Sequence, residues 1–185
     1  VAVMVGLPLL FAPFRALVGF RSDHHRSHLG WRRVPYIWMG TLLQFGGFAI
    51  MPFALLLLSE PTPETLWLGR VGAALAFVLV GAGIQITQTA GIALANDLSS
   101  KDKQPRVVAL LYTMLLLGMI VSSAIFGWML QSFTPSRLIQ VVQSCAVLVL
   151  VGNLVALWKQ EARSERRGAR QAGGFAQSLR SLMAI

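Results

Sequence analysis

The sequence predicts an all-α polytopic membrane protein, and three observations carry that prediction. First, 55% of the 185 residues are hydrophobic, only 12% are charged and the mean hydropathy is +0.64, which is too apolar for an ordinary water-soluble domain. Second, four long runs contain no Asp, Glu, Lys or Arg, and each provides the roughly 20 residues that a helix needs to cross about 30 Å of hydrocarbon. Third, these runs are continuous and rich in Leu, Ala and Gly, without the alternation of a membrane β-barrel.

The uncharged runs define the expected helices in order. The first apolar run, from Val1 to Phe14, has neither an initiator Met nor the basic start and cleavage site of a signal peptide. It is too short to cross alone and is interpreted as the end of a truncated span. The expected transmembrane bundle covers residues 1–158, with spans at about 1–18, 34–58, 69–95, 107–132 and 137–158. Residues 159–185 have the composition of a basic linker or surface segment.

The positions of the positive charges predict the orientation, because short loops rich in Lys and Arg stay in the cytoplasm. Fourteen of the sixteen Lys and Arg residues lie on one side of the predicted spans, in three groups: Arg15, Arg21, Arg26, Arg32 and Arg33; Lys101, Lys103 and Arg106; and Lys159, Arg163, Arg166, Arg167, Arg170 and Arg180. Only Arg70 and Arg137 lie on the other side. The basic loops and the tail are therefore expected in the cytoplasm.

Charge and composition also argue against several functions. The net charge of +9 could suggest nucleic acid, but the basic residues sit at helix ends, which favours membrane topology and anionic lipids as partners instead. The single Cys145 excludes a disulfide framework or a cysteine-based metal site. The sequence shows no nucleophile triad, phosphate loop or carboxylate pair, and this argues against an enzyme.

Small and polar residues within the spans indicate contacts between helices. Glycines let helix backbones approach closely in lipid, so they are expected at helix interfaces. They are Gly40, Gly46, Gly47, Gly72, Gly81, Gly83, Gly91, Gly118 and Gly127. The amides and hydroxyls of the spans must find partners in the membrane. Gly81, Gln85, Gln88 and Ala95 fall near one helical stripe, which is expected to line a cavity or to bridge to another helix.

Two loops resemble the major facilitator superfamily. Gly19, Asp23, Gly30, Arg32 and Arg33 match the superfamily motif Gly-x-x-x-Asp-Arg-x-Gly-Arg-Arg, although about four extra residues separate Asp23 from Gly30 and His24 replaces an Arg. A second loop carries an Asp at the end of one span and a basic residue before the next, at Asp97 and Arg106. The resemblance implies a helical bundle of that superfamily, with an incomplete N-terminal half that covers helices two to six. Residues 159–185 would then begin the central linker to a missing C-terminal half.

A finer resemblance involves the aromatic block that follows the first loop. Gly19 to Asp23, Leu29 to Trp38 and Gly40 to Gly46 are similar to the PucC/LhaA family, the light-harvesting complex assembly proteins also called bacteriochlorophyll-delivery members of the superfamily. The resemblance assigns a structural latch and docking surface to the matching residues. They are Gly19, Arg21, Asp23, Gly30, Trp31, Arg32, Arg33, Pro35, Tyr36, Trp38, Asp97 and Arg106.

This resemblance implies an assembly factor in the inner, photosynthetic membrane of a purple bacterium. Such a factor would deliver bacteriochlorophyll, chaperone antenna α and β polypeptides, or do both, with the reaction centre and bacteriochlorophyll synthase as further partners. The alternatives are an alternating-access transporter of a small amphipathic solute and a structural subunit of a photosynthetic supercomplex. The spans contain no ionisable residue that would couple transport to ions, which weakens the transporter alternative.

The candidate pigment-facing groups are the amides of Gln44, Gln85 and Gln88, because an amide oxygen can bind chlorophyll magnesium directly or through a water molecule. Interhelical hydrogen bonding is the competing interpretation of each. His24, His25 and His28 are common ligand types, but Arg21 and Arg26 flank them, so no metal site is expected there. Trp31, Tyr36 and Trp38 are expected to form an aromatic belt at the membrane interface or, alternatively, to stack on a pigment.

Overall fold

The computed structural model describes Gly19, residues 33–59 and residues 62–158. Almost all of these residues are helical and none of them forms a strand. The four long helices of this part are long and apolar enough to cross a membrane, which confirms the predicted all-α polytopic membrane class. The elements are α3 (Val34–Ser59), α4 (Leu66–Asp97), the 3-10 turn η2 (Lys101–Lys103), α5 (Gln104–Met129) and α6 (Pro135–Ala156). The expected span at 1–18 and the basic segment at 159–185 lie outside the described residues.

The helices begin and end a few residues away from the uncharged runs, because caps and prolines determine helix ends and a charge is tolerated in a terminal turn. Helix α4 exceeds the expected 69–95 at both ends, and α5 begins before 107 with a proline in its first turn, where proline's fixed φ suits a helix start. At α6, the Thr134 hydroxyl accepts a hydrogen bond from the Arg137 N–H at 3.2 Å. This cap moves the start of the helix from 137 to Pro135.

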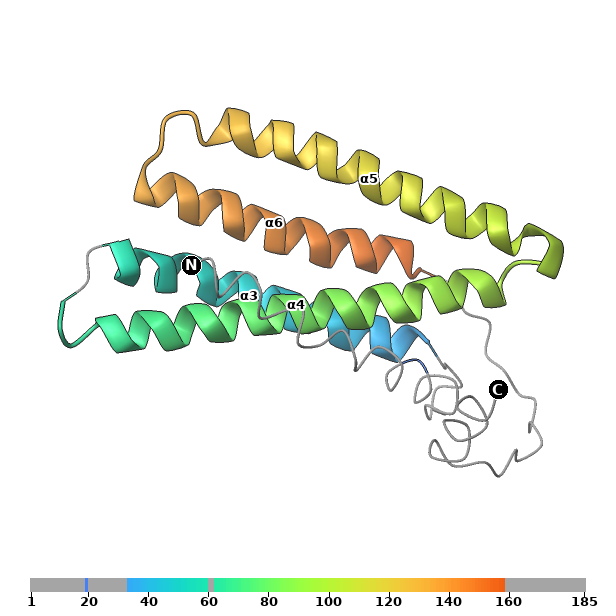
Figure 1. The fold of residues 1–185 in the computed structure, drawn as a ribbon, viewed down its shortest axis with the longest axis horizontal. Coiled ribbons are helices and arrows are strands. Elements are labelled where there is room, and N and C mark those ends of the chain that lie inside the picture. Colours follow the sequence, from blue (N-terminus) through green and yellow to red (C-terminus); the bar gives the residue numbers. More distant parts are fainter. Residues whose placement is uncertain (1–18, 20–32, 60–61, 159–185) are drawn as a thin grey trace, which may run out of the picture.

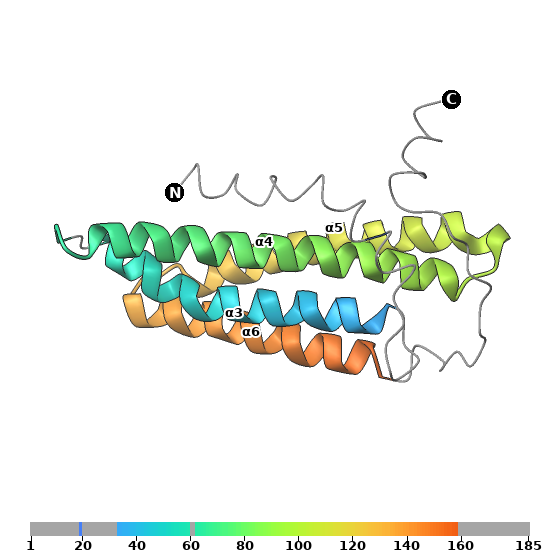
Figure 2. The same cartoon turned by 90° about the horizontal axis from the view of Figure 1, so that it is seen from below.

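The helices run roughly along one direction (Figure 1). Helix α3 packs mainly against α4 and, on another side, against α6, so that it lies between them (Figure 2). Helix α5 packs chiefly against α4 and η2 and contains no buried residue. The described part is therefore a tight α4–α3–α6 layer with α5 attached at one edge.

Glycines bring α3 and α4 into close contact. A Cβ atom built on Gly47 would lie 2.7 Å from the carbonyl oxygen of Ala76, and one built on Gly83 would lie 2.8 Å from the backbone nitrogen of Gln44. A Cβ on Gly40 would also collide with α4, at Thr87 and the Gly83 carbonyl. These backbone contacts leave no space for a side chain. The expected role of glycine in helix packing thus holds at this crossing.

The same expectation fails at four other glycines within the described residues. Built Cβ atoms on Gly46, Gly91, Gly118 and Gly127 meet nothing within 4 Å. Gly46 lies on a face of α3 that does not meet α4. Gly118 and Gly127 belong to α5, which the other described helices barely cover. The sequence shows that a residue is small, but it does not show which face of its helix meets a neighbour.

Gly47→Ala should destabilise the bundle, because the new methyl group collides with the α4 backbone. We expect a loss of about 1–3 kcal/mol, typical of overpacking in a tight interior, measured by chemical or thermal unfolding of the purified protein in detergent. The matched control is the adjacent Gly46→Ala, which should be neutral or stabilise by up to about 1 kcal/mol through helix propensity. Equal effects of the two substitutions would contradict the close crossing.

Candidate functional site

An ion pair joins the start of α3 to the end of α4. The Nε atom of Arg33 donates to Oδ2 of Asp97 at 3.1 Å, across 64 residues of sequence. The Arg33 side chain is only 7% exposed, whereas that of Asp97 is 48% exposed. Burying a guanidinium is costly unless it is paired, and Asp97 supplies an anionic partner for Arg33 here.

Arg33 also begins helix α3 through its backbone. Its carbonyl oxygen accepts hydrogen bonds from the N–H groups of Tyr36 and Ile37, at 3.0 and 3.2 Å. Pro35 lies in the first turn, where the missing N–H of proline removes no helical hydrogen bond. The sequence around the pair is thus suited to end a loop and start a helix at a fixed point.

An apolar cluster lies next to the ion pair and holds α3 on α4. Val34, Tyr36 and Ile37 from α3 are buried with Ala90 and Leu94 from α4. Trp38 packs against the cluster while partly exposed, and Tyr36 is 9% exposed. In the described structure Tyr36 is therefore part of a helix interface rather than of an exposed aromatic belt. We call Arg33, Asp97 and this cluster the α3–α4 clamp.

The other residues of the loop signature are not brought together in the same way. Gly19 lies near α4, where a built Cβ would be 3.7 Å from Cγ2 of Thr89. Arg106 is exposed in the first turn of α5. The remaining signature residues and the three histidines lie outside the described residues: Arg21, Asp23, Gly30, Trp31, Arg32, His24, His25 and His28.

Hydrogen bonds between side chains connect three helices within the predicted spans. Nε2 of Gln44 donates to Oγ1 of Thr87 at 3.1 Å, which joins α3 to α4. Nδ2 of Asn153 donates to Oγ1 of Thr41 at 2.8 Å, which joins α6 to α3. Gln44 is buried in the α3–α4 interface, so its surroundings favour the interhelical hydrogen bond over a pigment contact.

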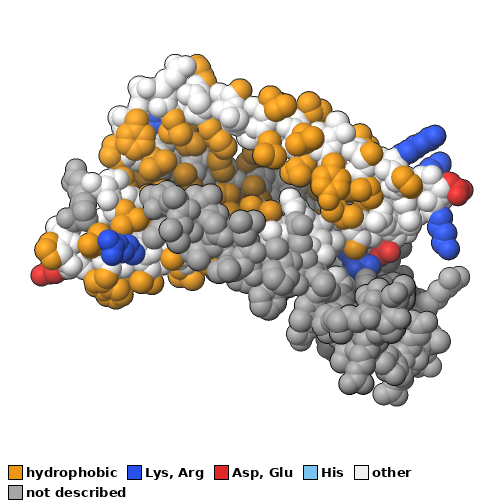
Figure 3. Space-filling view, in the orientation of Figure 1, with side chains coloured by type: hydrophobic (Ala, Val, Ile, Leu, Met, Phe, Trp, Pro, Cys, Tyr) orange, Lys and Arg blue, Asp and Glu red, His pale blue; other side chains and the backbone are white. Residues whose placement is uncertain are grey.

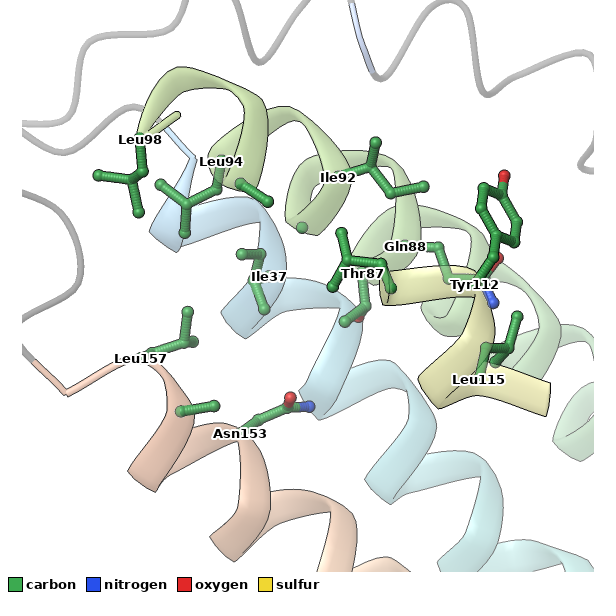
Figure 4. Close-up of a pocket in the computed structure, with 14 residues that line it drawn as sticks. Ile37, Thr87, Gln88, Ile92, Leu94, Leu98, Tyr112, Leu115, Asn153 and Leu157 are labelled. Carbon is green, nitrogen blue, oxygen red and sulfur yellow. The ribbon is translucent and has the colours of Figure 1, made fainter. Parts of the chain in front are cut away.

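A groove of about 480 Å³ lies between all four helices. Its lining contains four side chains with hydrogen-bonding groups, namely Thr87, Gln88, Tyr112 and Asn153, and no charged side chain. The remaining lining is aliphatic or glycine: Ile37, Gly91, Ile92, Leu94, Ala95, Leu98, Leu111, Leu115, Ala156 and Leu157. In Figure 4, Leu94, Leu98 and Leu157 lie toward one end of this four-helix groove, and Gln88, Tyr112 and Leu115 toward the other.

The three glutamines proposed from the sequence thus have different surroundings. Gln88 lines the groove, Gln44 is in the α3–α4 interface, and Gln85 is absent from the lining. The Gln85 Oε1 atom is buried without a hydrogen-bond partner among the described residues. Sequence reasoning missed Tyr112, because one hydroxyl in a long apolar run carries no sign of which neighbour its helix faces.

The groove is suited to an uncharged, largely apolar ligand with few polar atoms. Asn153 uses its amide nitrogen on Thr41, and its Oδ1 makes no hydrogen bond within the described part of the chain. Among the described residues, no group of three or more His, Cys, Asp or Glu side chains could hold a metal ion. The chemistry that these helices offer is binding and positioning at membrane depth.

Asp97→Asn should weaken the clamp, because it removes the carboxylate charge that the Nε atom of the buried Arg33 contacts. We expect a loss of about 1–3 kcal/mol in stability, as for hydrogen bonds to charged groups, and a coupling energy of similar size in a double-mutant cycle with Arg33→Gln. Unfolding in detergent measures both quantities. Arg70→Gln, at an exposed position, is the control and should change stability by less than about 0.5 kcal/mol. Additive effects of Arg33→Gln and Asp97→Asn would disprove the pair.

Thr41→Val should loosen α6 from α3, because the isosteric valine cannot accept the hydrogen bond from Asn153. We expect a loss of about 1 kcal/mol, in the range of interhelical hydrogen bonds in membranes, from the same unfolding measurement. Thr113→Val is the matched control, since Thr113 is exposed and bonds only the Ala109 carbonyl of its own helix, at 2.9 Å. A loss as large for Thr113→Val would remove the evidence for an interhelical contribution.

Comparison with known proteins finds relatives that match most of the chain. No solved structure matches the chain. Curated relatives named Protein PucC are 56% identical in Rhodovulum sulfidophilum over 94% of this chain, 58% identical in Rhodobacter capsulatus over 92%, and 53% identical in Cereibacter sphaeroides over 89%. The chain spans between 36% and 39% of the length of these relatives. The family described as PUCC protein matches residues 1–184, and the chain belongs to this family.

Proposed function

We propose that this chain forms part of an assembly factor for bacterial light-harvesting antenna complexes, which binds its partners within the membrane and catalyses no reaction. Membership of the PUCC protein family over residues 1–184 is the observation that carries the proposal. The uncharged spans and the apolar groove support it, because a factor that handles antenna components needs surfaces that bind apolar partners at membrane depth.

Helix α5 provides the largest surface of this kind among the described residues. Its membrane-spanning window has no buried residue, and its large side chains are exposed on several sides, including Leu116, Ile120 and Trp128 at 59, 67 and 72%. Hydrophobic side chains cover this helix in Figure 3. Association of helices in lipid relies on shape and small residues rather than on the hydrophobic effect, so the open Gly118 and Gly127 would let antenna α or β polypeptides pack closely on α5.

The four-helix groove is the proposed place for bacteriochlorophyll. Its aliphatic walls fit the apolar parts of the pigment, and Asn153, Gln88 and Thr87 would hold its polar groups. When bound, the pigment supplies a magnesium ion that accepts an oxygen ligand. Asn153 suits that role best, because its Oδ1 makes no hydrogen bond within the described structure while its nitrogen is fixed by Thr41.

We further infer that the protein lies in the inner, photosynthetic membrane with η2 on the cytoplasmic side. Lys101, Lys103 and Arg106 lie at the η2 end of the bundle, while Arg70 and Arg137 lie at the other. Basic residues in short loops favour the cytoplasmic side. The clamp lies at the same cytoplasmic end and would present a fixed loop to the reaction centre or to bacteriochlorophyll synthase.

Deletion of the gene from a photosynthetic host should lower the rate and the final amount of antenna assembly several-fold, measured by pulse labelling of α and β polypeptides and by near-infrared absorption. Restoring the full-length gene should restore both, and Arg70→Gln should restore them equally. Normal antenna formation at normal rates in the deletion strain would refute the proposal.

Gentle purification distinguishes the remaining alternatives. An assembly factor should copurify with immature complexes, whereas a structural subunit would be present in fixed proportion in mature ones. Pigment absorption that accompanies the purified protein, and that falls in Asn153→Leu, would support the groove as the pigment site. Solute uptake by vesicles that contain the purified protein, with no copurifying antenna polypeptide, would indicate a transporter instead.

A further inference from the structure

We propose that the η2 end of the bundle binds an anionic membrane phospholipid, with its headgroup on Lys101, Lys103 and Arg106 and one acyl chain in the four-helix groove. The proposal does not depend on the assembly function proposed above, because such a site would serve a membrane protein of any role. The acyl chain and a pigment would, however, be competing occupants of the four-helix groove. It rests on a cluster of exposed cations and on an apolar groove that begins beside it.

The cations lie at the end of the α4–α5 pair. Lys101, Lys103 and Arg106 are all exposed in η2 and the first turn of α5, and Figure 3 shows positive side chains at this end of the molecule. The turn is folded onto α4: Nε2 of Gln104 donates to the Asn96 carbonyl at 3.2 Å, and the Ser99 hydroxyl donates to the Ala95 carbonyl at 2.7 Å. The cations therefore occupy a defined place relative to the helices.

Among the described residues, two acidic side chains lie at the same end and leave the cluster positive. Asp102 is exposed between the two lysines and offsets one of their charges. Asp97 is paired with Arg33 and so contributes little field of its own. Basic residues between membrane helices on the cytoplasmic side are a known setting for anionic lipid headgroups.

The groove begins next to this cluster. Leu98 lines it and lies three residues before Lys101, while Leu111 lines it and lies five residues after Arg106. Five helical residues rise about 7.5 Å, which is within the span of a lipid headgroup and the first carbons of its chain. Behind these leucines most of the lining is aliphatic, and Gly91 leaves open space, since a Cβ built on it would meet nothing within 4 Å.

The combination favours a phospholipid over the other candidates. A soluble anion would use the cations alone and leave the groove without a role. A polypeptide segment would have to place acidic residues at the headgroup level and a slender apolar chain between the helices. A phospholipid carries its negative headgroup directly next to an apolar chain, as the cations and the groove require. Phospholipids also surround the protein in the membrane.

The test uses the purified full-length protein in detergent, incubated with equal amounts of phosphatidylglycerol and phosphatidylcholine of identical acyl chains. Retained lipid is counted by native mass spectrometry. We expect about one phosphatidylglycerol per chain to be retained in preference to phosphatidylcholine. Lys103→Gln/Arg106→Gln should reduce its affinity roughly tenfold or more, as expected for two basic residues near a membrane surface, and Gly91→Leu should reduce it by filling the groove.

Matched controls separate the site from general effects. Arg70→Gln/Arg137→Gln removes two charges at the opposite end, and Gly46→Leu adds the same side chain at an open glycine outside the groove; both should retain the lipid as the unmodified protein does. Equal retention of the two lipids, or unchanged retention in Gly91→Leu, would overturn the proposal. It would also be overturned if Gly91→Leu released an antenna polypeptide while the lipid stayed bound. Antenna assembly in cells is a separate readout, so failure here leaves the proposed function standing.

Discussion

The close crossing of α3 and α4 is the contact on which the rest of the described structure depends. Lipid tails are as apolar as the side chains of a membrane helix, so burial in the bilayer supplies little force to hold two helices together. Contact must come from van der Waals packing and from polar bonds. Gly40, Gly47 and Gly83 allow the backbones to meet directly, and at that separation Gln44 and Thr87 are near enough to share a hydrogen bond of 3.1 Å.

The same crossing determines the surroundings of the ion pair. Arg33 lies just before the start of α3 and Asp97 at the end of α4, the two helices that share the cluster of Tyr36, Ala90 and Leu94. Because the Arg33 side chain is only 7% exposed, its interaction with Asp97 is screened less than that of an exposed surface pair. The clamp therefore depends on the packing of α3 against α4 and also stabilises it. A substitution that weakens one should weaken the other.

The sequence predicted the class of fold because composition and uncharged runs act over whole helices. It could not place α5, since a run with apolar residues on all sides looks the same whether it faces lipid, a partner or another helix. The limits at the site have the same origin. Arg33 and Asp97 belong to two separate loop motifs in the sequence, and only the fold brings them to 3.1 Å. The sequence could not rank the three candidate amides, because each is simply an amide within a span. Only the direction that each residue faces on its helix shows that Gln88 lines the groove and that Gln44 and Gln85 do not.

Positive charge serves two different purposes at the η2 end, and burial distinguishes them. Arg33 is 7% exposed and pairs with Asp97, so the electric field of its charge is weak beyond its immediate neighbours. Lys101, Lys103 and Arg106 are exposed, with Asp102 between the two lysines, and their field extends for about a Debye length, roughly 8 Å at physiological salt. Since Arg33 occupies Asp97, that carboxylate does not pair with the exposed cations. The Arg33–Asp97 pair thus leaves the positive charge of Lys101, Lys103 and Arg106 available. Because the α3–α4 crossing holds that pair in place, the attraction of this surface for anions depends on a stable crossing.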